Sequence, residues 1–160
     1  MDLSTHINRR RLAVAGLGIA LVAVFTPEPA MAATEQQAKD MVAKAIALYD
    51  EKGEAALSIF NEGKASGFED GEVYIVVQSR GPDGKVVAHA ADPKLVGTPL
   101  KDIKDPKGVM FGEEMDAKAT AEGAWFDYTW PDPATGRMAA KKSWFVLHDN
   151  LVFISGIYVR

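Results

Sequence analysis

Hydrophobic and polar positions after residue 33 divide the chain into a helical part and a strand-rich part. Apolar residues recur first at three- and four-residue steps: Ala38, Met41, Val42, Ala45, Ile46 and Tyr49. This spacing predicts a helix with one buried stripe. Thr34 followed by Gln37 matches a capping box at its start, and Gly53 is placed to end it as a left-handed cap. A second short helix, with Leu57 and Phe60 on one side, is expected to follow.

The middle of the chain predicts a β-hairpin between two irregular segments. Asn61–Gly71 contains three glycines and few apolar residues, which indicates a loop. Glu72–Gln78 and Val86–Ala90 are rich in β-branched residues, and the turn residues Gly81–Gly84 lie between them. Asp92–Gly108 contains three prolines and is expected to be irregular.

The last third of the chain predicts one more helix and three strands. The helix covers Val109–Glu122 and ends at Gly123. The strands are Ala124–Trp130, Met138–His148 and Leu151–Val159. Sequential hairpins require antiparallel pairing, and the first helix needs a sheet face to bury its stripe. The predicted fold class is therefore α+β: an antiparallel sheet of about five strands with a long N-terminal helix and a middle helix.

The first 32 residues have the three parts of a secretory signal peptide. Arg9–Arg11 precede the uncharged run Leu12–Phe25, and Ala30–Ala32 form a small-x-small site. The run is shorter than the roughly 20 residues that span a bilayer. We expect cleavage after Ala32, a signal peptide over 1–32 and one domain over 33–160, in the periplasm or secreted. A retained anchor and a twin-arginine export route are alternatives that the pattern leaves open.

Composition and charge exclude several classes of protein. The 160 residues are 48% hydrophobic and 25% charged, as in globular domains. With a net charge of −4, the protein is not expected to have the basic surface that binds nucleic acid. The absence of cysteine excludes disulfides and thiolate metal sites. No second long apolar run follows the leader, and the chain stops at Arg160. We therefore expect a soluble mature protein without an attached output domain.

The polar residues do not form a catalytic constellation. His148 is expected at an exposed hairpin end, whereas His89 ends a strand and serves either a backbone contact or a ligand. Ser143 and Ser155 lack an evident base. We expect no enzyme activity, no catalytic residue, no metal site and no cofactor.

Aromatic residues gather in the closing strands. They are Trp125, Phe126, Tyr128, Trp130 and Trp144. Alternation along a strand places Tyr128 and Trp130 on one face and Trp125 on the other. Lys141 and Trp144 are an odd number of positions apart, so they face opposite sides unless a bulge intervenes. These aromatic residues either fill a core or line a small pocket in which one cation binds an anionic ligand.

Short motifs in a fixed order carry a family resemblance. They are Lys52-Gly53, Phe60-Asn61, Gly71–Val77, Asp83–His89, Leu95–Gly97, Asp105–Gly108, Gly123–Pro131, Lys141–Trp144 and Ser155–Tyr158. With these motifs the chain resembles the single Cache domains of the second type, over roughly Thr34–Tyr158. The resemblance implies a PAS-like fold and a pocket for small molecules, often short carboxylates, between the sheet and the middle helix. Family members are sensing domains, not enzymes.

The resemblance also implies a set of ligand-binding residues. They are Tyr74, His89, Met110, Phe111, Trp125, Tyr128, Lys141 and Trp144. Lys141 would pair with a carboxylate, and Tyr128 and His89 would donate hydrogen bonds. The chain departs from the family pattern in having Ala90 after His89 and Trp144 where tyrosine is common.

The sequence therefore predicts a free-standing, secreted Cache domain that binds a short organic acid. It would serve extracytoplasmic sensing, as in chemotaxis, or deliver the ligand to a membrane receptor or transporter. The sequence also leaves open a homodimer through the first helix. One alternative is a structural or interaction module with a filled aromatic core and no small-molecule ligand. Another is an enzyme or the accessory subunit of an enzyme, which only the twin-arginine pattern favours.

Overall fold

The computed structural model describes residues 32–159. The predicted signal peptide lies outside the described residues except for Ala32. Within residues 32–159, no helix is both long enough and apolar enough to cross a membrane.

The first helix begins and ends where the sequence predicts. In α1 (Glu35–Lys52), the Thr34 hydroxyl accepts the Gln37 N–H at 3.2 Å, and the Gln37 side chain accepts the Thr34 N–H at 2.8 Å. This reciprocal capping box satisfies two of the free N–H groups at the helix start. Gly53 ends the helix with φ +59°, a conformation that L side chains rarely adopt.

A five-stranded antiparallel sheet has the order β4-β3-β7-β6-β5. Its strands are β3 (Val76–Ser79), β4 (Val86–His89), β5 (Ala124–Pro131), β6 (Met138–His148) and β7 (Leu151–Tyr158). A separate two-stranded sheet pairs β1 (Glu69–Asp70) with β2 (Val73–Tyr74). The α+β fold class is confirmed.

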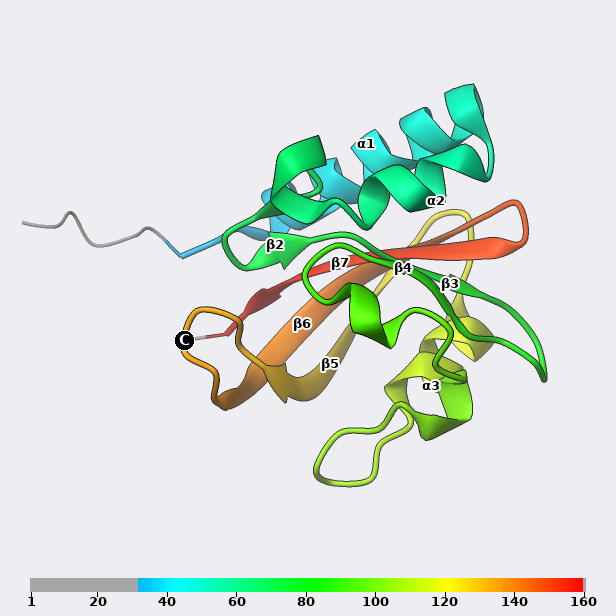
Figure 1. The fold of residues 1–160 in the computed structure, drawn as a ribbon. Coiled ribbons are helices and arrows are strands. Elements are labelled where there is room, and N and C mark those ends of the chain that lie inside the picture. Colours follow the sequence, from blue (N-terminus) through cyan, green and yellow to red (C-terminus); the bar gives the residue numbers. More distant parts are fainter. Residues whose placement is uncertain (1–31, 160) are drawn as a thin grey trace, which may run out of the picture. The chain divides into compact units, whose positions relative to one another are not determined.

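Helices cover the two faces of the main sheet differently (Figure 1). α1 and α2 (Ala55–Phe60) lie over one face, and α3 (Phe111–Lys118) lies over the other. Strand alternation divides the core accordingly. Phe153 of β7 packs with Phe60 under the first pair of helices, whereas its neighbour Ile154 packs with Phe111 and Met115 under α3. The full burial of Phe60 and Phe153 stabilises the fold by about 1.5–3 kcal/mol for each side chain.

The predicted hairpin strand is interrupted. At Ile75 the backbone N–H donates to Phe68 and the carbonyl accepts from Ala90, so the chain changes partners between β2 and β3. The predicted loop Asn61–Gly71 contains a 3₁₀ turn, Gly63–Ser66, and the strand β1.

The middle helix is shorter than predicted. The prediction of Val109–Glu122 was wrong at both ends, because α3 covers only Phe111–Lys118. Ala119 is extended, and the Thr120 carbonyl accepts the Leu147 N–H from β6 at 2.8 Å. This contact to the sheet replaces the helical hydrogen bonds that the continued pattern would have made.

Candidate functional site

A small cavity of about 40 Å³ lies between the main sheet and α3. Its lining residues come from β2, β3, β4, β5, β6, β7, α3 and the segment between β4 and α3. They are Tyr74, Val76, Gln78, Val86, His89, Leu95, Ile103, Phe111, Gly112, Met115, Tyr128, Trp130, Lys141, Ser143, Ile154, Ser155 and Gly156.

Strand register gives the cavity a polar end and an apolar end. Lys141 of β6 is paired with Tyr128 of β5 on one side and with Tyr158 of β7 on the other. Ile154 of β7 is paired with Val76 of β3, and Val76 is paired on its other side with His89 of β4, so the apolar end follows directly on the polar end. The cavity therefore suits a ligand with one polar group and a short apolar part.

Lys141 carries the charge at the polar end. The residue is only 3% exposed, and its Nζ lies 3.8 Å from the ring centroid of Tyr74 and 4.9 Å from that of Tyr158. Among residues 32–159, its ammonium forms neither a hydrogen bond nor an ion pair within the usual distance limits. Burial lowers the pKa of Lys141 from 10.5 to about 7, although the carboxylates of Glu72 and Asp132 oppose this shift.

His89 presents a neutral ring to the cavity. Its Nδ1 accepts the Asp92 backbone N–H at 2.9 Å, and its own backbone N–H donates to Asn61 Oδ1 at 2.9 Å. Burial, followed by the nearby charge of Lys141, lowers the pKa of His89 to about 4. Because Nδ1 is an acceptor in a neutral ring, the hydrogen is on Nε2. His89 is thus a hydrogen-bond donor at the cavity wall.

The tyrosines of this end are also neutral. Tyr158 donates its hydroxyl to the Pro131 carbonyl at 2.6 Å, so the Tyr74 hydroxyl, 3.4 Å away, is the donor in their contact. Tyr128 lies 3.1 Å from Ser143 Oγ. Burial raises the pKa of Tyr158 to about 12 and those of Tyr74 and Tyr128 well above their usual value. Within the described residues, Lys141 is therefore the one charged side chain that lines the cavity at neutral pH.

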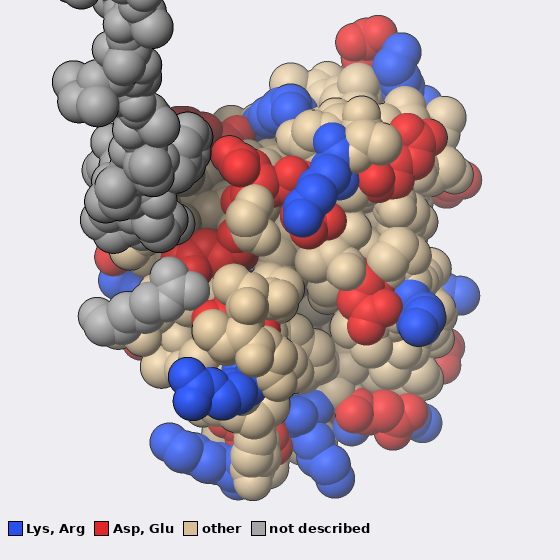
Figure 2. Space-filling view, turned by 60° about the vertical axis from the view of Figure 1, so that its left-hand side comes forward, with Lys and Arg blue, Asp and Glu red and all other residues tan. Residues whose placement is uncertain are grey.

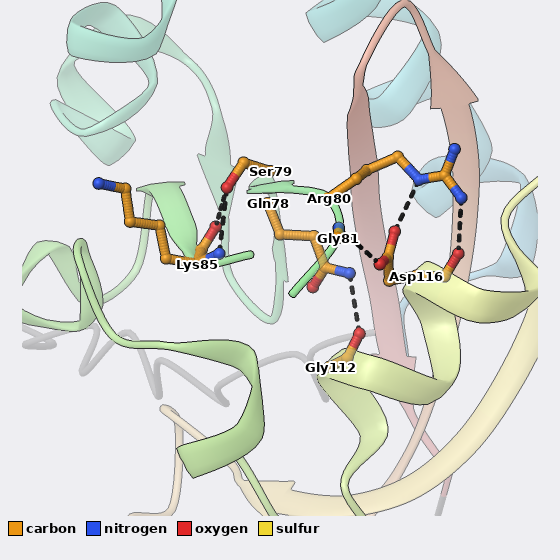
Figure 3. A network of polar contacts seen from close by, with 7 residues as sticks. All are labelled: Gln78, Ser79, Arg80, Gly81, Lys85, Gly112 and Asp116. Carbon is orange, nitrogen blue, oxygen red and sulfur yellow. Dashed lines mark hydrogen bonds and ion pairs between the residues drawn. The ribbon is translucent and has the colours of Figure 1, made fainter. Parts of the chain in front are cut away.

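Polar contacts hold α3 over the cavity (Figure 3). Gln78 Nε2 of β3 donates to the Gly112 carbonyl at 2.9 Å. Just after β3, Arg80 Nε contacts Asp116 Oδ1 at 2.6 Å, and the Gly81 N–H donates to Asp116 Oδ2 at 3.0 Å. These bonds fix the helix that supplies Phe111 and Met115 to the cavity.

A glycine keeps the sheet side of the cavity open. Gly156 of β7 is paired with Ser143 of β6. A Cβ added at Gly156 would overlap Ser143 Oγ and lie 2.6 Å from the Lys142 carbonyl oxygen. Only glycine fits here without displacing the neighbouring strand.

Five of the eight predicted site residues meet at the cavity. They are Tyr74, His89, Phe111, Tyr128 and Lys141. The rings of Phe111 and Tyr128 are stacked with their centroids 4.2 Å apart, which closes the cavity between α3 and β5.

The other three predicted residues lie elsewhere. Trp125 and Trp144 are paired across β5 and β6 on the face that α1 covers, with ring centroids 5.3 Å apart and Lys39 Nζ of α1 4.6 Å from Trp144. Strand alternation gives the reason, because Trp125 and Tyr128 are an odd number of residues apart. Met110 precedes α3 and is 44% exposed.

Several lining residues were not among those predicted from the sequence. The same alternation rule assigns Ser143 to the face of Lys141, and Trp130 to that of Tyr128, so these two had a usable signal. Leu95 and Ile103 come from the irregular segment before α3, for which no periodic pattern indicates a direction.

Charges on the surface are mixed. Over the face drawn in Figure 2, acidic and basic side chains are interspersed in the upper part, and basic side chains predominate along the lower edge.

Comparison with known proteins identifies the family. The model of the Cache domain matches residues 30–156, and the chain therefore belongs to the Cache domain family.

A curated relative is the methyl-accepting chemotaxis protein McpP of Pseudomonas putida. It is 36% identical over 93 residues, which make up 56% of this chain and 17% of that protein. The chain thus spans less than a fifth of the length of this relative.

Solved structures share the fold. A methyl-accepting chemotaxis protein from Vibrio parahaemolyticus matches with a TM-score of 0.58 and 24% identity, covering 75% of this chain and 82% of that one. A Cache chemosensory domain studied for carboxylic acid recognition matches with a TM-score of 0.58 and 25% identity, covering 78% and 88%. A periplasmic sensor domain of a chemotaxis protein matches with a TM-score of 0.57 and 25% identity, covering 78% and 90%.

Proposed function

We propose that this chain is a free-standing, secreted Cache domain that binds a short organic acid and reports its presence to a separate membrane partner. One observation carries the proposal: Lys141 is a buried cation without a hydrogen-bonding partner among the described residues, and it lines a small cavity. Among residues 32–159 no carboxylate lines that cavity, although Glu72 and Asp132 lie near enough to raise the pKa of Lys141.

The acid would lie with its carboxylate at the polar end. Lys141 would form a charge-assisted hydrogen bond, which is about twice as strong as a neutral one. The Nε2–H of His89 and the hydroxyl pair of Tyr128 and Ser143 supply further donors. The alkyl part would extend toward Val76 and Ile154.

Cavity size limits the ligand. A volume of about 40 Å³ has room for roughly three water-sized groups. This favours the shortest acids, of two or three carbons, over longer chains, and the tethered helix α3 restricts expansion.

The sensory role is supported by the relatives. McpP is a chemotaxis protein, and one structural relative was studied for carboxylic acid recognition by a Cache chemosensory domain. The leader predicted over residues 1–32 would place the domain outside the cytoplasm. A membrane receptor or transporter would then receive the signal, and α1 is the candidate surface for a homodimer.

The alternative, an interaction module with a filled aromatic core, requires this space to be packed. The cavity beside Lys141 therefore favours ligand binding over that alternative.

The test is thermal denaturation of the purified protein with acetate, propionate and, as a charge control, methylammonium. An acid at 100 times its Kd should add about 2.7 kcal/mol to the free energy of unfolding, a rise of several degrees in Tm. Methylammonium should have no effect. If neither acid stabilises the protein, or if methylammonium stabilises it equally, the proposal is wrong.

A further inference from the structure

The amine of Lys141 is placed as a nucleophile as well as a cation. An exposed lysine is kept protonated by water, whereas Lys141 is 3% exposed and lacks hydrogen-bonding partners among residues 32–159. Its Nζ is held over the Tyr74 ring at 3.8 Å, and the residue lines a small cavity. Burial of a lysine in such an apolar pocket is one of the ways in which proteins activate its amine.

We propose that Lys141 condenses reversibly with the carbonyl group of a small 2-oxo acid or aldehyde, and holds it in the cavity as an imine. This inference rests on the proposed function, because it assigns a ligand class to the same cavity. It goes beyond the proposed function because Lys141 would recognise the carbonyl group of the ligand and not the carboxylate alone.

The condensation balances without an oxidant or reductant. The lone pair of the neutral Nζ attacks the carbonyl carbon, the carbonyl π pair moves to oxygen, and a proton passes from nitrogen to that oxygen. The resulting carbinolamine loses its hydroxyl group and the remaining N–H proton as one water molecule, which leaves a C=N bond. The Nε2–H of His89 is a neutral donor at the same wall for the carbonyl oxygen.

Burial outweighs the charges around Lys141 and favours its neutral amine. The groups that face it are Tyr74 of β2, Tyr158 of β7, His89 of β4, and the carboxylates of Glu72 and Asp132. The first three are neutral at pH 7, and the two carboxylates only partly oppose the effect of burial. With the pKa of Lys141 lowered to about 7, roughly half of the amine is unprotonated at neutral pH.

Lys142 is a matched control on the adjacent residue. Its side chain is 29% exposed on the opposite face of β6, where Nζ forms an ion pair with Glu35 at 2.6 Å and lies 4.9 Å from the Trp125 ring. Lys142 also lies over an aromatic ring, but it is partly exposed and ion-paired, whereas Lys141 is buried without an ion pair among the described residues.

The experiment traps the imine. Purified protein is incubated with glyoxylate and cyanoborohydride, which reduces an imine to a stable secondary amine, and the modified lysines are mapped by peptide mass spectrometry. Lys141 should be modified ahead of Lys142 and the other lysines, and excess acetate should protect Lys141 selectively. Lys142→Arg should keep this modification, and Lys141→Arg should lose it.

Two outcomes overturn the inference: Lys141 stays unmodified, or it is modified no faster than Lys142 and without protection by acetate. The wild-type protein alone decides this, so a folding defect of Lys141→Arg leaves the test intact. If acetate stabilises the protein but Lys141 is not trapped, the imine is refuted and acid binding stands. If Lys141 is trapped selectively but no acid stabilises the protein, the imine stands and acid binding is refuted.

Discussion

Replacing Lys141 by methionine should make the folded protein more stable while it removes acid binding. Methionine keeps a linear side chain of similar volume, so the packing against Tyr74 and Tyr158 is largely retained. What is lost is the ammonium, which the folded protein holds away from water. The substitution therefore separates the cost of the buried charge from the packing of the side chain.

The pKa of Lys141 gives the size of the stabilisation expected for Lys141→Met. A pKa difference of one equals about 1.4 kcal/mol between the two protonation states. Lowering the pKa of Lys141 from 10.5 to about 7 therefore corresponds to about 5 kcal/mol of stability that the charged lysine removes below pH 7. Methionine avoids this cost, so Lys141→Met should raise the free energy of unfolding by up to about 5 kcal/mol there.

The size of the stabilisation by Lys141→Met depends on pH. Between pH 7 and 10.5 the unfolded chain keeps the lysine proton and the folded chain does not, so the stability of the wild-type protein rises with pH. Below pH 7 both states carry the proton, and the slope from this group vanishes. The advantage of Lys141→Met is thus largest at and below neutral pH, and shrinks by up to about 1.4 kcal/mol for each pH unit above it.

Urea denaturation of both proteins at several pH values measures this difference. Lys142→Met is the matched control, since its partly exposed ion pair with Glu35 should contribute no more than about 1 kcal/mol. If Lys141→Met is less stable than the wild type at pH 6, or if its advantage does not change between neutral and alkaline pH, the reasoning about the buried ammonium is refuted.

Three further predictions concern the cavity, the strand β7 beside it and the helix α3 that covers it. Propionate affinity should fall by up to about tenfold per pH unit above pH 7, because a carboxylate binds the protonated form of Lys141, and equal affinities at neutral and alkaline pH by calorimetry would contradict this. Gly156→Ala should lower the free energy of unfolding by about 1–3 kcal/mol, since its Cβ overlaps Ser143 Oγ; an unchanged urea midpoint would speak against that overlap. Asp116→Ala should cost about 1–3 kcal/mol by removing the side-chain bonds to Arg80 and to the Gly81 N–H, and amide exchange in α3 should accelerate; unaltered exchange would show that these bonds do not hold the helix.

Local signals in the sequence predict most of the helices and strands. The capping box at Thr34 and Gln37 and the left-handed Gly53 determine both ends of α1. β6 has the predicted bounds, and β5 and β7 differ by one residue at one end, because turn residues flank alternating apolar runs there.

Tertiary contacts decide the parts that were mispredicted. The apolar pattern after Val109 continues beyond the end of α3, but the Thr120 carbonyl bonds to Leu147 of β6 instead of continuing the helix. Ile75 similarly divides its backbone bonds between Phe68 and Ala90. Partners that are distant in the chain compete with the local preference, and a local pattern carries no information about them.

The alternation of side chains along each strand predicts which residues of β5 and β6 face the cavity. Tyr128 and Lys141 are directly opposite each other on β5 and β6, which places both at the cavity. The family resemblance added Trp125 and Trp144 to the predicted site. Both are an odd number of residues from the strand positions that face the cavity, so they lie on the α1 face, where they pack against each other. The sheet order, which brings β3 beside β7, is needed to see that Val76 and Ile154 form the apolar end.

Calorimetric titration of the wild-type protein and Lys141→Met with propionate shows whether Lys141 holds the acid. Saturable binding of one acid per wild-type domain is expected, and none to Lys141→Met even though that variant is at least as stable. Equal binding to both proteins would show that Lys141 does not hold the acid.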